Sequence, residues 1–200
     1  MSDSPNAGNL PTIRAGIVAG FFACLAYALI AIGRLPVQAV AVLVAGFGPA
    51  FCIAVFGLRT FLDLDGPLTS SSLGMFMNML AGGIFSMMGM IQLAFAVAQP
   101  NAPVPMETRA IWLGFDVAWD AFLCCGTGCF ALAMWWHPRF GPTFAFAGLA
   151  LAAGLMTLHL ITFPWPPQNR GFFDLGPAIG LWYLVVCIQM LRSLSWARQR

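Results

Sequence analysis

The sequence predicts an all-α fold, a polytopic transmembrane helical bundle that forms a single domain over residues 1–200. Hydrophobic residues make up 60% of the chain. Charged residues make up only 8%, where soluble domains carry about 25%. The mean hydropathy is +0.84. Six apolar segments also approach the ~20 residues that a helix needs to cross a bilayer. The lipid bilayer is therefore the first expected partner.

The six spans are predicted at residues 13–33, 37–58, 73–98, 110–136, 143–163 and 175–191. Residues 1–12 are polar and too few to fold, so they are expected to form a tail. Tight turns that contain arginine and proline follow the first and fourth spans, whereas longer loops follow the second, third and fifth. Six spans place both termini on the same side of the membrane.

The second and third spans carry signals for close helix packing. Pro49 and two glycines interrupt the second span, and a proline removes one backbone N–H and disturbs the preceding turn. A local kink that faces the bundle is expected there, because the freed backbone groups need partners in a membrane. In the third span, Gly82, Ser86 and Gly89 recur at helical spacing and predict a face that lets a neighbouring helix approach.

The fourth span contains two acidic residues, Asp116 and Asp120, which lie one helical turn apart with Thr127 on the same face. A carboxylate at membrane depth costs roughly 2.5–3.5 kcal/mol, so both are expected to face the protein interior or a wet cavity. Two carboxylates this close repel each other when both are ionised, so the pair can retain a proton. A buried structural pair is the alternative interpretation.

The fifth span places His159 about one turn from its end. Because the chain crosses the membrane in the fourth span and returns in the fifth, this end lies on the same membrane side as the start of the fourth span. The rise per helical residue then places His159 at a depth from which it can reach Asp116. The sequence predicts an outward-opening polar pocket that contains Asp116, Asp120 and His159, with Trp112 and Trp119 near its wall. A hydrogen-bonded interface residue is the alternative role for this histidine.

The sixth span begins after Asp174, which stands where a helix cap would, and a tail with three arginines and Trp196 follows it. This tail is suited to lie along an anionic membrane surface. All nine basic residues are arginines, and they lie at the ends of apolar runs, which argues against a nucleic-acid surface. The side with the termini holds Arg14, Arg59, Arg139, Arg192, Arg198 and Arg200, and the other side holds Arg34, Arg109 and Arg170. This bias predicts cytoplasmic termini.

Two loops of similar sequence suggest an internal duplication. Phe61 to Pro67 reads FLDLDGP, and Phe172 to Pro177 reads FFDLGP, each before an apolar span. Because each unit would contain three spans, the two halves would have opposite orientations. This indicates a 3+3 inverted repeat, an arrangement found in transporters.

The C-terminal half contains the strings Trp119-Asp120, His137-Pro138-Arg139-Phe140-Gly141, Thr162-Phe163-Pro164, Phe173-Asp174-Leu175-Gly176-Pro177 and Leu181-Trp182-Tyr183. Through these motifs it resembles a family of small multi-pass bacterial inner-membrane proteins of uncharacterised function. It implies a location in a bacterial inner membrane and says nothing about chemistry.

The predicted function is a proton-linked small-solute transporter or a membrane sensor that uses Asp116, Asp120 and His159 to bind a proton or solute. One alternative is an intramembrane metal-assisted enzyme with the same residues as ligands. Another is a structural or assembly subunit of a membrane complex, and a homo-oligomer is a further expected association. The sequence contains no HExxH or GxSxG motif and no cysteine–histidine spacing typical of metal sites. No catalytic residue, cofactor or metal site is therefore assigned, and no nucleic-acid partner is expected.

Overall fold

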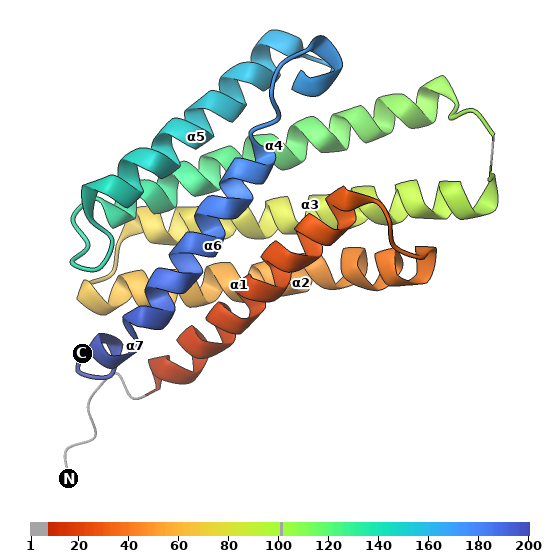
Figure 1. The fold of residues 1–200 in the computed structure, drawn as a ribbon. Helices are drawn as coiled ribbons and strands as arrows, with labels where there is room; N and C mark the ends of the chain where they lie inside the picture. Colours follow the sequence, from red (N-terminus) through yellow and green to blue (C-terminus); the bar gives the residue numbers. More distant parts are fainter. Residues whose placement is uncertain (1–7, 101) are drawn as a thin grey trace.

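The computed structural model describes residues 8–100 and 102–200, and within these ranges the chain is helical with no β-strand. The long helices are α1 (Asn9–Ile32), α2 (Val37–Leu62), α3 (Thr69–Ala98), α4 (Met106–Met134), α5 (Gly141–Thr162) and α6 (Gly176–Arg192). The 3-10 helices η1 (Asp63–Asp65) and η2 (Pro167–Arg170) and the short helix α7 (Leu194–Ala197) complete the fold. The predicted all-α helical bundle is confirmed (Figure 1).

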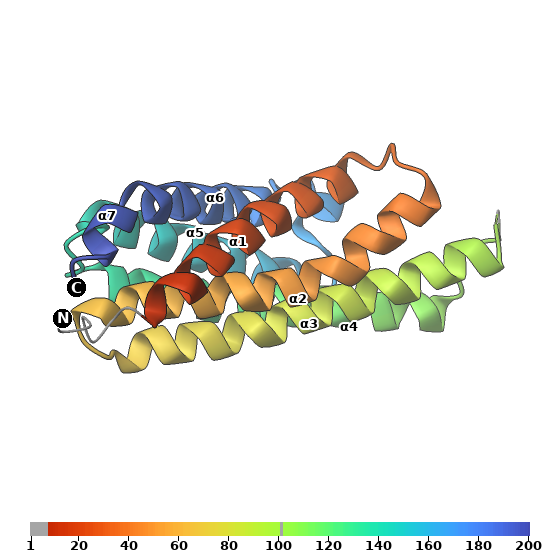
Figure 2. The same ribbon diagram turned by 90° about the horizontal axis from the view of Figure 1, so that it is seen from below.

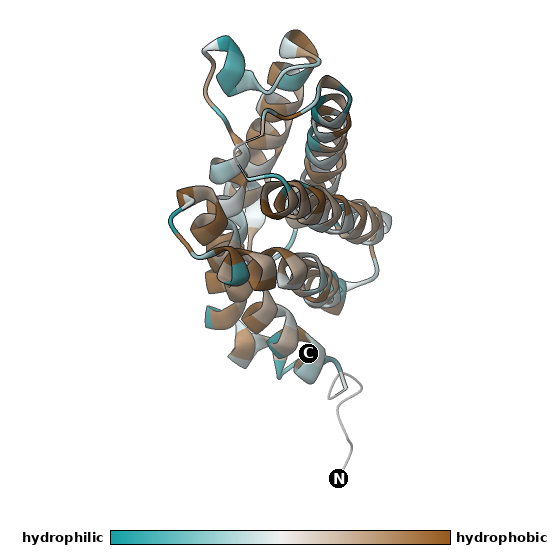
Figure 3. Ribbon diagram, turned by 90° about the vertical axis from the view of Figure 1, so that its right-hand side faces the viewer, coloured by the Kyte–Doolittle hydropathy of each residue, from teal (hydrophilic) through white to brown (hydrophobic). Residues whose placement is uncertain are grey.

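The helices α1 to α5 are long and apolar enough to cross a membrane. Large apolar side chains remain exposed on them, such as Val18 at 70% and Leu160 at 73%. Hydrophobic residues predominate along the helices (Figure 3). Such a surface suits contact with lipid, and the chain is a helical membrane protein. α6 has 17 residues, or ~25 Å, slightly less than the ~30 Å hydrocarbon core, so its role as a sixth span stays a prediction.

Consecutive helices from α1 to α5 pack side by side along the chain, and α6 lies against α1 (Figures 1 and 2). α5 and α6 make far fewer contacts with each other. The beginning of α1 and the C-terminus lie at the same end of the bundle as the turns after α2 and α4.

The prediction that residues 1–12 form a tail is wrong for its last part, because α1 already begins at Asn9. Pro11 is tolerated there, since first-turn N–H groups lack helical partners. Residues 1–7 lie outside the described part of the chain.

A serine side chain from α3 enters the backbone of α2 beside Pro49. The N–H of Gly48 donates to Ser86 Oγ at 3.0 Å, and the Ser86 hydroxyl donates to the carbonyl of Val44 at 2.8 Å. Val44 precedes Gly48 by four residues, so the hydroxyl bridges a donor and an acceptor of the helical ladder. α2 bends along its length (Figure 2). The expected kink therefore has a protein partner for its backbone groups.

A buried hydrogen-bond network joins α3, α4 and α6 in the bundle interior. Tyr183 Oη donates to Asn78 Oδ1 at 2.9 Å and lies 3.1 Å from Thr127 Oγ1. The Asn78 amide also donates to the carbonyl of Gly74 at 2.8 Å. A Cβ at Gly126 would collide with this amide, so α3 and α4 approach closely only because Gly126 lacks a side chain.

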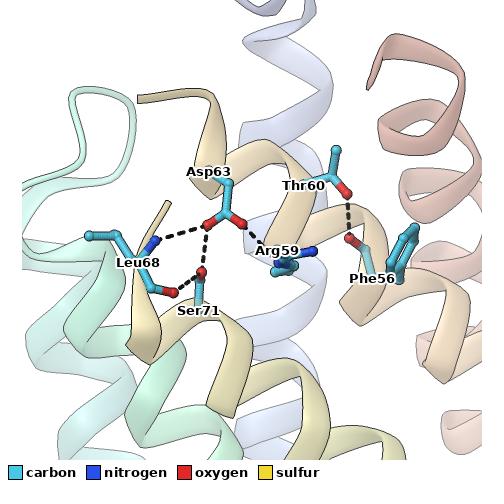
Figure 4. Close-up of polar contacts among 6 residues, drawn as sticks. All are labelled: Phe56, Arg59, Thr60, Asp63, Leu68 and Ser71. Atoms are coloured by element: carbon cyan, nitrogen blue, oxygen red, sulfur yellow. Dashed lines mark hydrogen bonds and ion pairs between the residues drawn. The ribbon is translucent and has the colours of Figure 1, made fainter. Parts of the chain in front are cut away.

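The turn between α2 and α3 is fixed by Asp63 (Figure 4). Its carboxylate pairs with Arg59 at 2.8 Å and accepts hydrogen bonds from the Ser71 hydroxyl and the Leu68 N–H. Asp174 has a matching role before α6, where it accepts the N–H of Gly176 at 2.8 Å. The two similar loops thus share a capping aspartate. However, α2 packs along α3 while α5 contacts α6 only slightly, and the inverted repeat stays a prediction.

The C-terminal segment folds back onto the end of the bundle. Trp196 is buried and contacts the rings of Phe61 and His137. Its ring centroid lies 5.3 Å from the guanidinium carbon of Arg139 and 5.4 Å from that of Arg200. This differs from the expected position along a membrane surface, because the aromatic side chains at this end offer Trp196 a buried site. Burial also lowers the pKa of His137 to about 4.

Candidate functional site

The most unusual polar contact in the described part of the bundle joins two helices through Asp120 and His159. Asp120 Oδ2 lies 2.7 Å from His159 Nε2. The two residues are 8% and 5% exposed, so the contact is buried. α4 supplies the carboxylate and α5 the imidazole, and the tight turn over residues 135–140 makes these helices antiparallel neighbours.

The second ring nitrogen of His159 has no protein partner. Nδ1 is buried and finds no hydrogen-bond partner among the described residues. When Nε2 donates its proton to a carboxylate, Nδ1 of a neutral imidazole is left as an acceptor. The pair therefore retains an acceptor that a proton can occupy. If the Asp120–His159 contact served only helix packing, the buried Nδ1 atom would have no hydrogen-bond partner to explain it.

The pairing of His159 with Asp120 differs from the expected pairing with Asp116. Asp116 lies as many residues before the end of α4 as His159 lies after the start of α5. The backbones of Asp116 and His159 are therefore at the same height along this antiparallel helix pair. Side chains lean toward the N-terminus of their own helix, and in antiparallel helices they lean in opposite directions. The histidine therefore meets the aspartate one turn nearer the shared connection, which is Asp120.

Asp116 lines the same cavity as the buried pair, with a volume of about 70 Å³. Its lining comes from α1, α3, α4, α5, η2 and the start of α6: Tyr27, Phe85, Met88, Asp116, Trp119, Asp120, His159, Gln168, Asp174 and Gly176. Gln168 and Asp174 are exposed, so the cavity reaches the surface at the end of the bundle opposite the C-terminus. The structure thus brings the three predicted residues to one cavity.

The two tryptophans expected near the wall have different positions. Trp119 lines the cavity, whereas Trp112 lies against Phe95 with ring centroids 5.8 Å apart and is absent from the lining. Sequence reasoning missed the contributions of Tyr27 and Asp174. Tyr27 is one of only two tyrosines and lies within an apolar span, which was an available signal for a polar interior. Asp174 was interpreted only as a helix cap, a role that it also has.

No three His, Cys, Asp or Glu side chains in the described ranges are grouped so that they could hold a metal ion. The site instead combines a carboxylate–imidazole pair, two further carboxylates and aromatic walls, a set suited to binding protons or cationic groups. Searches of protein-family models, curated proteins and solved structures find no match to this chain.

Proposed function

We propose that this chain is a proton-linked transporter of a small solute, in which the Asp120–His159 pair binds and releases the coupling proton. The observation that carries the proposal is the buried 2.7 Å contact at the wall of a cavity, with His159 Nδ1 left without a partner. Ionisable groups inside membrane helices commonly mark proton and ion pathways.

The cavity supports this role through the order of its carboxylates. Asp116 precedes Asp120 by one turn of α4, on the side toward the surface opening near Gln168 and Asp174. A proton that enters from that surface therefore meets Asp116 before it reaches the buried pair. Asp120 and His159 can each exist with or without a proton, so proton transfer changes the charge of the cavity wall.

The proposed location is a bacterial inner membrane with both termini in the cytoplasm. Six of the nine arginines belong to the side with the termini, which favours this orientation. The cavity then opens away from the cytoplasm, toward the side from which a proton gradient commonly drives protons inward.

The test uses the purified protein in liposomes that contain a pH-sensitive dye. Small amines, amino acids, carboxylates and sugars are added outside one at a time, and proton movement is recorded. We expect one class to drive proton movement, and Asp120→Asn and His159→Gln to abolish it. Glu107→Gln is the matched control, because Glu107 is exposed in the first turn of α4 and lies outside the cavity lining.

Infrared difference spectra between acidic and neutral pH provide the second readout. A carboxyl band that is present in the wild-type protein and missing in Asp120→Asn would support a titrating pair. If no solute class moves protons and this band is unchanged by the substitution, the proposed function is wrong. The pair would then serve helix packing, as in a structural subunit.

A further inference from the structure

The charges around the polar cavity favour a cationic ligand. Three carboxylates line it against a single imidazole, and no lysine or arginine is among the described lining residues. Even when His159 carries a proton and neutralises Asp120, the carboxylates of Asp116 and Asp174 remain. Three aromatic side chains complete the wall, and aromatic faces attract organic cations. They are Tyr27, Phe85 and Trp119.

A second, apolar cavity of about 50 Å³ adjoins the first. α1, α2 and α6 form most of its wall, with side chains such as Phe47, Phe51 and Val55. Tyr27 and Trp119 line both cavities. The Tyr27 ring lies beside Gly180 on the apolar side, and its hydroxyl lies near Gly176 at the polar cavity. Tyr27 therefore stands at the junction between the two cavities.

The apolar cavity is better suited to a hydrocarbon group than to water. A buried water typically makes about three hydrogen bonds, and apolar cavities of comparable character stay dry. A hydrocarbon group that enters such a space gains the transfer free energy of each buried methylene. Its small volume limits that group to a few carbon atoms.

We propose that the two cavities together bind a short-chain alkylammonium ion. Its ammonium group lies among the carboxylates and aromatic rings of the polar cavity. Its alkyl chain passes Tyr27 into the apolar cavity. This inference rests on the proposed function, for which it names the class of solute. Because the cation and the proton are attracted to the same carboxylates, cation binding favours release of the proton to the aqueous side of the cavity.

Calorimetric titration of the purified protein in detergent tests the inference with a series of probes. Methylammonium, n-propylammonium and n-butylammonium differ only in chain length, n-butanol lacks the charge, and butyrate reverses it. We expect affinity to rise about fourfold per added methylene, from ~0.8 kcal/mol of burial each. n-Butanol and butyrate are expected to bind far more weakly than n-butylammonium.

Two pairs of variants assign the parts of the ligand to the two cavities. A Cβ at Gly180 would lie 3.7 Å from the Tyr27 ring, so Gly180→Ala is accommodated, whereas the larger side chain of Gly180→Leu fills the apolar space. Gly180→Leu should remove the dependence on chain length and retain methylammonium binding, and Gly180→Ala should largely keep both. Asp116→Asn should weaken every cation about tenfold, and Glu107→Gln should not.

Equal affinities for methylammonium and n-butylammonium, or binding of n-butanol as tight as that of n-butylammonium, would overturn the inference. These wild-type measurements do not depend on the folding of any variant. Proton movement driven by another solute class, without alkylammonium binding, would overturn the inference and leave the proposed function standing. Alkylammonium binding with the predicted chain dependence, but without proton movement in liposomes, would support the inference and contradict the proposed function.

Discussion

Two substitutions of Asp120 should differ sharply in their effect on stability. Asp120→Ala leaves both ring nitrogens of His159 without a partner in the interior, and removal of one member of a buried pair costs about 3–5 kcal/mol. Asp120→Asn keeps the shape and an acceptor for the Nε2 proton, and it loses only the charge. The difference between charged and neutral hydrogen bonds predicts a cost of about 1–1.5 kcal/mol. The asparagine variant should therefore fold and yet move no protons.

The free energy of unfolding can be measured by titration of mixed micelles with SDS, followed by tryptophan fluorescence. Trp119 makes this signal sensitive to the site, because it lines the same cavity. The double variant Asp120→Leu/His159→Phe is the control for packing, since apolar replacement of a buried ion pair is often neutral or stabilising by about 1–4 kcal/mol. It should recover the stability of the wild-type protein and remain inactive.

Two results would refute this reasoning. Proton movement retained by Asp120→Asn would show that the carboxylate does not carry the coupling proton. A loss of stability in Asp120→Asn as large as in Asp120→Ala would show that the charge itself holds α4 and α5 together, which favours a packing role.

Three further predictions concern packing, pH dependence and topology. Gly126→Ala should destabilise the protein by about 1–3 kcal/mol through overpacking, whereas Gly128→Ala, which has open space, should be neutral or slightly stabilising. The pKa of His137 falls from 6.5 to about 4 on folding, so the unfolded state binds this proton more readily than the folded state. The free energy of unfolding should therefore decrease by about 3 kcal/mol as the pH falls from 6.5 to 4, and His137→Phe should remove this decrease. Equal pH profiles of the variant and the wild-type protein in the same unfolding assay would contradict this prediction. An impermeant thiol reagent added from outside should label cysteines introduced in 99–105 and spare those in 63–68, and the reverse pattern would invert the topology.

Most of the fold was predictable because its signals are local. Apolar length and the prolines, glycines and arginines at the ends of the apolar runs predict the boundaries of the six helices α1 to α6 to within four residues. Burial of Trp196 was not predictable in this way, because it depends on rings contributed by α2 and by the turn after α4. Local sequence does not report such long-range contacts.

The candidate site was accessible from the sequence only in part. Asp116, Asp120 and His159 stood out because ionisable side chains are rare within apolar spans. Their partners were harder to identify, since the Asp120–His159 contact depends on opposite side-chain directions in antiparallel helices. Tyr27 and Asp174 come from the two ends of the chain and meet only in the tertiary structure. The functional roles of all these residues stay predictions.

The Ser86 bridge has a mechanical consequence for any opening of the bundle. The Ser86 hydroxyl of α3 bonds to the N–H of Gly48 and the carbonyl of Val44 in the backbone of α2. Neither helix can therefore slide or rotate past the other without breaking these two hydrogen bonds. Joint motion of α2 and α3 keeps both hydrogen bonds and is therefore favoured over sliding between them. α6 is also restrained, because Tyr183 bonds to Asn78 of α3 and lies 3.1 Å from the Thr127 hydroxyl of α4, and Trp182 Nε1 donates to the Phe144 carbonyl of α5. Motion of α6 that widens the apolar cavity must therefore break these contacts, just as sliding between α2 and α3 breaks those of Ser86.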